Sequence, residues 1–219
     1  MGILLLLRHG RASLGFANYD ELSELGRRQA RAAGDRLARA DLDIGPVVCG
    51  SLVRQRDSAT AVLAGLGRSS DDLAVDDRLD EYDHVGVLAA HSSTVTFEGA
   101  TTADANRAVQ SALDEAIVRW AAGDGTYLED HDQYTGRVIA VVADLAARPG
   151  TTVAVTSGGV IAVACTHLLG LPVWQWPALA RVVVNGSITK ILSGRSGTNL
   201  LSFNDHAHLE TERDTITYR

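Results

Sequence analysis

The sequence has few cysteines and no long hydrophobic run. Its two cysteines, Cys49 and Cys165, are too few for a disulfide framework, and neither lies in a CxxC or metal-type spacing. We therefore expect both to be small buried residues in a protein of a reducing compartment, the cytoplasm. The apolar run at residues 3–7 is shorter than a signal-peptide core or a membrane span and lacks a basic start. No membrane partner is expected.

Positive charge is also scarce. The chain has 20 Lys and Arg residues against 27 Asp and Glu residues, a formal net charge of −7. Nucleic acids and anionic lipid surfaces require a positive face, so we expect neither as a partner. A small phosphorylated ligand needs only a local cluster of arginines, and this class of partner stays open. The sequence does not indicate an oligomeric state.

What is present is the pattern of an α/β protein. Short apolar runs alternate with longer amphipathic ones, which is typical of a mostly parallel sheet with helices on both faces. The pattern predicts strands at residues 3–7, 46–48, 151–156, 182–184, 188–192 and 199–203. It predicts helices over residues 22–37 with Ser23 as N-cap, 54–66 and 160–169.

The segment between residues 82 and 149 differs in character. Residues 91–101 are rich in Ser, Thr and Gly, and two helical stripes follow. The stripes carry Val109, Leu113, Ile117 and Trp120, and then Val138, Val142 and Leu145. We interpret residues 1–219 as one domain with a helical insertion at about residues 85–135, placed over the carboxyl ends of the strands. Loop positions such as Thr94 and Glu98 would then face the organic part of a ligand.

The first candidate for chemistry is Arg8-His9-Gly10, at the carboxyl end of the first predicted strand, where open α/β sheets place their sites. A neutral histidine nitrogen can attack phosphorus, and an arginine offers planar, permanently charged donors to phosphate oxygens. Gly10 would leave room for close approach to the backbone. The alternative is an Arg-His pair that opens an ordinary surface loop, since three residues are a weak motif.

The residues that follow carry a resemblance. They are Arg8-His9-Gly10-Arg11-Ala12-Ser13, Tyr19-Asp20, Leu22-Ser23-Glu24-Leu25-Gly26 and Gln29-Ala30. This series resembles the opening of the phosphoglycerate-mutase-like histidine phosphatases, and most closely the bacterial members that read Arg-His-Gly-Gln-Ala-Ser. Arg11 departs from their glutamine. The resemblance covers most of the chain outside residues 86–130. It implies a three-layer α/β fold and a phosphatase that uses no metal and no cofactor.

The resemblance also implies a second phosphate-binding arginine and a general acid. Aligning the end of the family motif Ser-Pro-Leu-x-Arg-Ala-x-x-Thr-Ala with Ser58-Ala59 places Arg54 at the arginine position, at a helix amino end that favours anions. Arg56 is the competitor, on another helical face. The family's Leu-x-Glu matches Leu79 to Glu81, although five acidic residues lie in residues 76–83 and most must face water.

One element departs from the family pattern. Most members carry a second catalytic histidine in Ser-His-Gly-Gly, whereas this chain has Ser157 before Gly158 and Gly159. A serine donates one hydrogen bond but carries no charge. We expect Ser157 and Gly158 to bind the phosphate, with weaker catalysis than two histidines give.

The remaining histidines and tryptophans have plainer interpretations. His84 could reach the site, but an exposed loop histidine is the simpler account. His206 and His208 could form a metal pair, yet two histidines without matching ligands more often make structural hydrogen bonds, so no metal is expected. His91, His131 and His167 are assigned no role. Trp120 is assigned to the core of the insertion, and Trp174 and Trp176 stay open.

The sequence thus predicts a phosphatase that hydrolyses phosphate monoesters of small molecules through a phosphohistidine at His9. Glu81 would protonate the leaving alcohol, and Arg8 and Arg54 would hold the phosphoryl oxygens. Two alternatives remain: a phosphoglycerate-type mutase, and a phospho-ligand-binding protein that has lost turnover.

Overall fold

The computed structural model of the chain describes residues 1–13, 20–91, 103–210 and 214–218, without the side chains of residues 103–107, 109–110 and 173. Tyr19, Thr94, Glu98 and the side chain of Val109, which the sequence analysis names, lie outside the described part.

The centre of the fold is a six-stranded sheet in the order β3-β2-β4-β1-β5-β6. The strands are β1 Gly2–Arg8, β2 Ile44–Cys49, β3 Leu73–Val75, β4 Gly150–Thr156, β5 Ile188–Gly194 and β6 Gly197–Asp205. β1 pairs in parallel with β4, and β2 in parallel with β4 and β3, whereas β5 is antiparallel to both β1 and β6. The sheet is therefore mostly parallel, as predicted.

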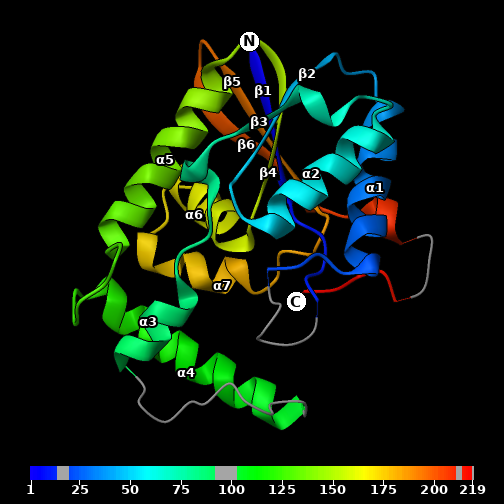
Figure 1. Cartoon of the computed structure of the whole chain (residues 1–219). Helices are drawn as coiled ribbons and strands as arrows, with labels where there is room; N and C mark the ends of the chain where they lie inside the picture. Colours follow the sequence, from blue (N-terminus) through cyan, green and yellow to red (C-terminus); the bar gives the residue numbers. More distant parts are fainter. Residues whose placement is uncertain (14–19, 92–102, 211–213, 219) are drawn as a thin grey trace.

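Helices cover both faces of this sheet (Figure 1). They are α1 Glu24–Ala38, α2 Val53–Gly65, α3 His84–His91, α4 Ala103–Ala121, α5 His131–Ala147, α6 Gly158–Leu168 and α7 Trp176–Ala180. α1 and α2 pack on one face, and α5 and α6 on the other. The predicted N-cap of α1 is confirmed, because the Ser23 hydroxyl accepts a hydrogen bond of 3.0 Å from the Gly26 N–H.

Strand β1 shows why the two layers form. Its leucines are all fully buried, and alternate side chains point to opposite faces of a strand. Leu5 and Leu7 pack against α1 and α2, whereas Leu4 and Leu6 pack against α5 and α6. The strand therefore has no polar face, and its first polar side chains are those of Arg8 and His9 at its carboxyl end.

The strand predicted at residues 182–184 is wrong, because this segment has the backbone of a turn followed by irregular structure. Several of its backbone groups bond to side chains instead of to a neighbouring strand. The Val184 N–H donates to Asn204 Oδ1 at 2.7 Å, and the Val182 carbonyl accepts from Asn204 Nδ2 at 2.7 Å. The Val183 carbonyl accepts from the Arg8 guanidinium. The other predicted strands are confirmed.

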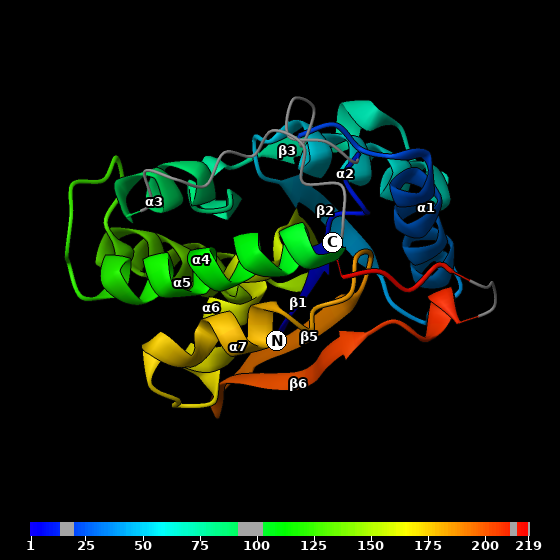
Figure 2. The same ribbon diagram turned by 90° about the horizontal axis from the view of Figure 1, so that it is seen from below.

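Helices α3, α4 and α7 lie beyond the carboxyl ends of β1 and β4 (Figures 1 and 2). A cluster of aromatic rings joins them to α5. Tyr82 stacks on Trp120 at 5.2 Å between ring centroids, and contacts Tyr134 and Trp176 edge-on at 5.6 and 5.5 Å. Trp120 is 1% exposed, which confirms its place in the core. In the described part of the chain no helix could span a membrane.

Candidate active site

A cavity of about 380 Å³ opens at the carboxyl ends of β1 and β4. Its polar end brings together six of the residues on which the sequence analysis or its motifs focused: Arg8, His9, Arg54, Glu81, Gly158 and Gly159. They come from the end of β1, the first turn of α2, the segment after β3 and the amino end of α6. Four segments far apart in the sequence thus meet at one edge of the sheet.

His9 is held at a fixed place and in one tautomer. Its N–H donates to the Thr156 carbonyl at 2.8 Å, and its carbonyl accepts from Asn185 Nδ2 at 3.2 Å. Ring atom Nδ1 lies 2.7 Å from the Gly10 carbonyl, which can only accept, so Nδ1 carries the hydrogen. Nε2 is then the unprotonated nitrogen, and it lies 3.3 Å from Arg54 Nε.

The environment keeps this imidazole neutral. His9 is 4% exposed. Burial and the positive charges of Arg54 and Arg8 together hold the pKa of His9 well below its ordinary value. A neutral ring with a free electron pair on Nε2 is the form that can attack phosphorus.

Arg54 is the arginine that reaches the site. Its side chain is buried, whereas that of Arg56 is exposed and does not line the cavity. Arg54 Nη1 pairs with Asp20 Oδ1 at 2.7 Å, and Asp20 Oδ2 also accepts from the Val53 N–H at 3.0 Å. The α2 N-cap residue, Leu52, makes no side-chain cap. Asp20, which is distant in the sequence, therefore caps α2 with one carboxylate oxygen and holds the Arg54 side chain with the other.

Glu81 accepts three hydrogen bonds. The donors are the Tyr134 hydroxyl at 2.8 Å, the Gly159 N–H at 2.9 Å and the Tyr82 N–H at 3.3 Å. Burial, and next the negative charge of Glu81, raise the pKa of Tyr134 well above its ordinary value, so this hydroxyl keeps its proton and donates. A Cβ at Gly159 would come within 2.2 Å of Glu81 Oε1. Position 159 must therefore be glycine for the carboxyl group to lie against α6.

Helix α5 also braces the segment that carries this carboxyl group. Arg137 Nη1 donates to the carbonyls of Arg78 and Asp80 at 2.9 and 2.8 Å. Arg137 lies 4.9 Å from the Tyr134 ring centroid. The sequence analysis missed both α5 residues. Tyr134 and Arg137 are three residues apart and so lie on one face of a helix. This spacing is the sequence signal that could have indicated a shared role.

Ser157 lies beneath the cavity and is not among the described residues that line it. It is 1% exposed, and its hydroxyl oxygen accepts a hydrogen bond of 2.9 Å from Gln55 Nε2. The same Gln55 nitrogen donates to the Leu79 carbonyl at 3.0 Å. Gln55 stands where the family motif has alanine, and the sequence analysis assigned it no role. The sequence predicted that Ser157 binds phosphate directly, and the lining of the cavity gives that contact no support.

Gly10 is needed for the packing of α1. A Cβ there would lie 2.1 Å from the Gly26 carbonyl oxygen. The Gly10 N–H donates to Ser58 Oγ at 3.0 Å, and Gly10 is not among the described cavity-lining residues. The close approach that this glycine permits is therefore that of a helix. Its contact with a ligand stays a prediction.

His84 departs from expectation. It begins α3, is partly buried and lines the cavity, so its interpretation as an exposed loop histidine is wrong. The helix that contains it turns its ring toward Tyr82, with 6.5 Å between the centroids. The side chain of Arg11 is not among those that line the cavity.

The remaining predicted positions have structural surroundings. His208 Nε2 lies 3.0 Å from the Gly186 carbonyl, and among the described residues no group of three or more His, Cys, Asp or Glu side chains could hold a metal ion. Trp176 lines the cavity, whereas Trp174 is 66% exposed. Burial raises the pKa of Cys49 to about 11 and that of Cys165 to about 12, consistent with two inert, buried thiols.

Comparison with known proteins identifies relatives of this architecture. The model of the histidine phosphatase superfamily (branch 1) matches residues 4–206. Glucosyl-3-phosphoglycerate phosphatase of Mycolicibacterium vanbaalenii is 31% identical over 195 residues, which cover 80% of this chain and 78% of the relative. The native structure of a mycobacterial glucosyl-3-phosphoglycerate phosphatase is 26% identical, with a TM-score of 0.63 over 92% of this chain and 98% of that one. YhfR of Bacillus stearothermophilus shares the fold, with a TM-score of 0.67 at 20% identity over 95% of this chain and 99% of that one.

Proposed function

The chain belongs to the histidine phosphatase superfamily and is a phosphatase of that type, and on this premise we propose that it hydrolyses phosphate monoesters through a phosphohistidine at His9. The observation that carries the proposal is the state of His9. Its ring is buried and neutral, with Nε2 unprotonated inside a cavity that Arg8, Arg54 and Glu81 also line.

In the first step, His9 Nε2 attacks phosphorus and the bond from phosphorus to the alcohol oxygen breaks. Glu81 transfers its proton to that oxygen, so the alcohol leaves neutral and Glu81 becomes a carboxylate. Arg8 and Arg54 bind the phosphoryl oxygens and stabilise the charge that spreads over them. The amino end of α6, at Gly158, adds backbone donors.

In the second step, water attacks the phosphorus of the phosphohistidine. The Glu81 carboxylate accepts the proton from this water, the bond between nitrogen and phosphorus breaks, and inorganic phosphate leaves. His9 returns to its neutral form and Glu81 to its protonated form. Both residues are thus restored without a cofactor or a metal ion.

Arg54 has two partners during this cycle. Its Nε group lies 3.3 Å from His9 Nε2, the atom that must bond to phosphorus. A phosphoryl group that binds there takes the place of this contact, and the guanidinium then donates to a phosphoryl oxygen. The pairing with Asp20 holds the arginine near both positions.

We place the substrate among small phosphorylated molecules, and we treat residues 1–219 as one domain whose insertion, at about residues 85–135, covers the site. The second histidine of the family motif is absent, since Ser157 stands in its place. The site therefore has one cation fewer, and we expect moderate activity.

The test is a panel of phosphate esters. It includes glucosyl-3-phosphoglycerate and phosphoserine, the esters after which similar proteins are named. Wild type should release phosphate, His9→Ala should not, and the exposed-site control His167→Ala should match wild type. Isomerisation of phosphoglycerate without phosphate release would establish a mutase. Tight binding of phosphate esters without turnover would establish a binding protein.

A further inference from the structure

The far end of the cavity has a different chemistry from the end that carries His9. Its wall comes mainly from α4 and α7, with Tyr82 from the segment that follows Glu81. Leu113 and Ile117 of α4 are 8% and 4% exposed, and Trp176 of α7 is 1% exposed. Pro177 and Ala180 of α7 also line the cavity, and so do four polar residues: His84, Asp114, Arg181 and Tyr218.

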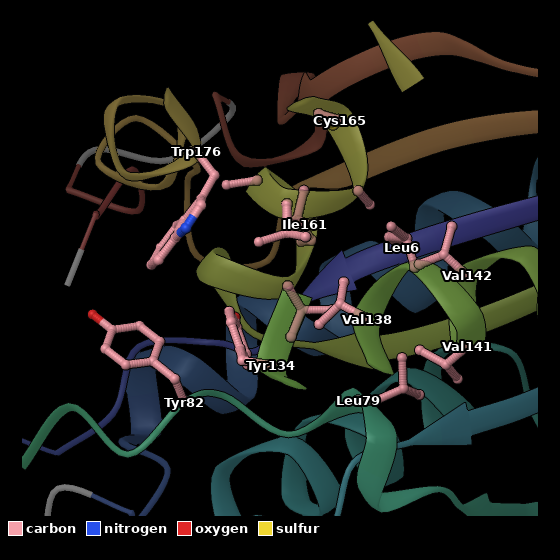
Figure 3. Packing of buried hydrophobic residues seen from close by; sticks show 14 of the residues in the cluster. Leu6, Leu79, Tyr82, Tyr134, Val138, Val141, Val142, Ile161, Cys165 and Trp176 are labelled. Carbon is pink, nitrogen blue, oxygen red and sulfur yellow. The ribbon is translucent and has the colours of Figure 1, made fainter. Parts of the chain in front are cut away.

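Three polar side chains of this wall have partners within the protein. Trp176 Nε1 donates to His131 Nε2 at 3.2 Å, so the indole offers a ligand only its ring. Arg181, which follows α7, pairs with Asp114 of α4 at 2.9 Å. This ion pair ties the two helices of the wall together. Figure 3 shows the side chains of Tyr82 and Trp176 at one end of the buried cluster, where the two rings meet edge-on.

We infer that the alcohol part of the substrate is an apolar group of about the size of a six-membered ring, bound against Ile117, Tyr82 and Trp176. This inference rests on the proposed function, because it assumes that the phosphate lies at His9. A phosphate fills only part of a cavity of about 380 Å³, and the rest can enclose a ring. Apolar carbons gain contact with Leu113, Ile117 and Ala180, whose side chains offer the hydroxyls of a sugar ring no hydrogen-bond partner.

A matched pair of substrates isolates this preference. Cyclohexylmethyl phosphate and glucose 6-phosphate are both esters of a primary alcohol, with one carbon between the oxygen and a six-membered ring. Their leaving groups have similar shape and chemistry, and they differ mainly in the ring hydroxyls. We expect kcat/KM to be at least about tenfold higher for cyclohexylmethyl phosphate. Equal or faster hydrolysis of glucose 6-phosphate overturns the inference.

Methyl phosphate separates this inference from the proposed function. If the enzyme releases phosphate neither from these three esters nor from any ester of the wider panel, the proposed function fails. If methyl phosphate is hydrolysed as well as cyclohexylmethyl phosphate, the chemistry stands and the apolar subsite is wrong.

A matched pair of variants tests the wall itself. Ile117→Ala removes buried carbons from the cavity, and Val118→Ala makes a similar change at the next residue, which is 70% exposed. Ile117→Ala should lower kcat/KM for cyclohexylmethyl phosphate by roughly 10–200-fold and leave methyl phosphate nearly unchanged. Val118→Ala should change neither. An equal loss on both esters in a folded Ile117→Ala protein, or no loss at all, overturns the assignment.

A second variant tests the same wall in case the Ile117→Ala protein does not fold. Ala180→Leu narrows the same end of the cavity from α7, at a partly exposed position. It should reduce turnover of cyclohexylmethyl phosphate more than that of methyl phosphate. The opposite order of sensitivity contradicts a ring-binding wall.

Discussion

We predict that Ser157→Ala lowers the free energy of unfolding by about 1–3 kcal/mol, because it leaves a buried donor without an acceptor. Gln55 is fully buried, and its Nε2 donates to both the Leu79 carbonyl and Ser157 Oγ. Removing the Ser157 hydroxyl leaves one N–H group of the Gln55 amide without an acceptor. In a chain of this size, each kcal/mol moves Tm by roughly 2–4 °C, so the expected drop is about 2–12 °C.

Turnover should change much less. If the Ser157 hydroxyl donated directly to a phosphoryl oxygen, its loss would cost about 2.7–4 kcal/mol of transition-state stabilisation, or roughly 10²–10³ in kcat. Ser157 is not among the described residues that line the cavity. We therefore expect kcat for a small ester to fall less than about tenfold, a loss below 1.4 kcal/mol.

The assay is a double-mutant cycle with Gln55→Met, which keeps the length of the side chain and removes its polar atoms. The Leu79 carbonyl keeps a donor in this variant, since it also accepts from Thr156 Oγ1 at 2.6 Å. Losing both partners of a buried hydrogen bond costs less than losing one. The double variant should therefore lose less free energy of unfolding than the two single variants together, by about 1 kcal/mol. Additivity within about 0.3–0.5 kcal/mol would refute the contact, and a loss of kcat of about 100-fold in a folded Ser157→Ala protein would refute its position beneath the cavity.

Three further outcomes follow from the contacts of the site. Glu81→Gln should slow hydrolysis of alkyl esters far more than that of aryl esters, because aryl oxygens leave without a proton; an equal loss would move the acid role elsewhere. Tyr134→Phe should give the same leaving-group pattern, with a loss of roughly 10–100-fold on alkyl esters from one charge-assisted hydrogen bond, and an unchanged pattern would reduce Tyr134 to a packing residue. Burial lowers the pKa values of His9, His131 and His208, so below about pH 6.5 the unfolded chain binds protons that the folded chain does not. Stability is then full above this pH and falls on acidification, and a Tm that is unchanged between pH 7.5 and pH 5.5 contradicts that sign.

Local sequence patterns were enough for five of the six strands, and the family resemblance for two of the reactive side chains. The leucines of β1 and the Ser23 cap of α1 are set by residues close in the chain, so periodicity and capping rules predict them. Arg54 and Glu81 follow from the resemblance to the family motifs, and the structure brings both to the cavity.

The supporting contacts could not be predicted, because they join residues that are distant in the sequence. Tyr134 and Glu81 are 53 positions apart, and Gln55 and Ser157 are 102 positions apart. No local pattern pairs them. The failed strand at residues 182–184 has the same origin, since the Asn204 side chain takes the backbone groups that a β-branched run would offer to a sheet.

The most direct test of the account is chemical trapping of the intermediate on His9. Wild-type enzyme mixed with a phosphate ester labelled in the phosphoryl group, and quenched within the first turnovers, should carry the label in an acid-labile, base-stable bond that maps to His9. His9→Ala should carry no label and release no phosphate. A labelled His9→Ala protein, or wild-type turnover with the label on another residue, would contradict the histidine nucleophile.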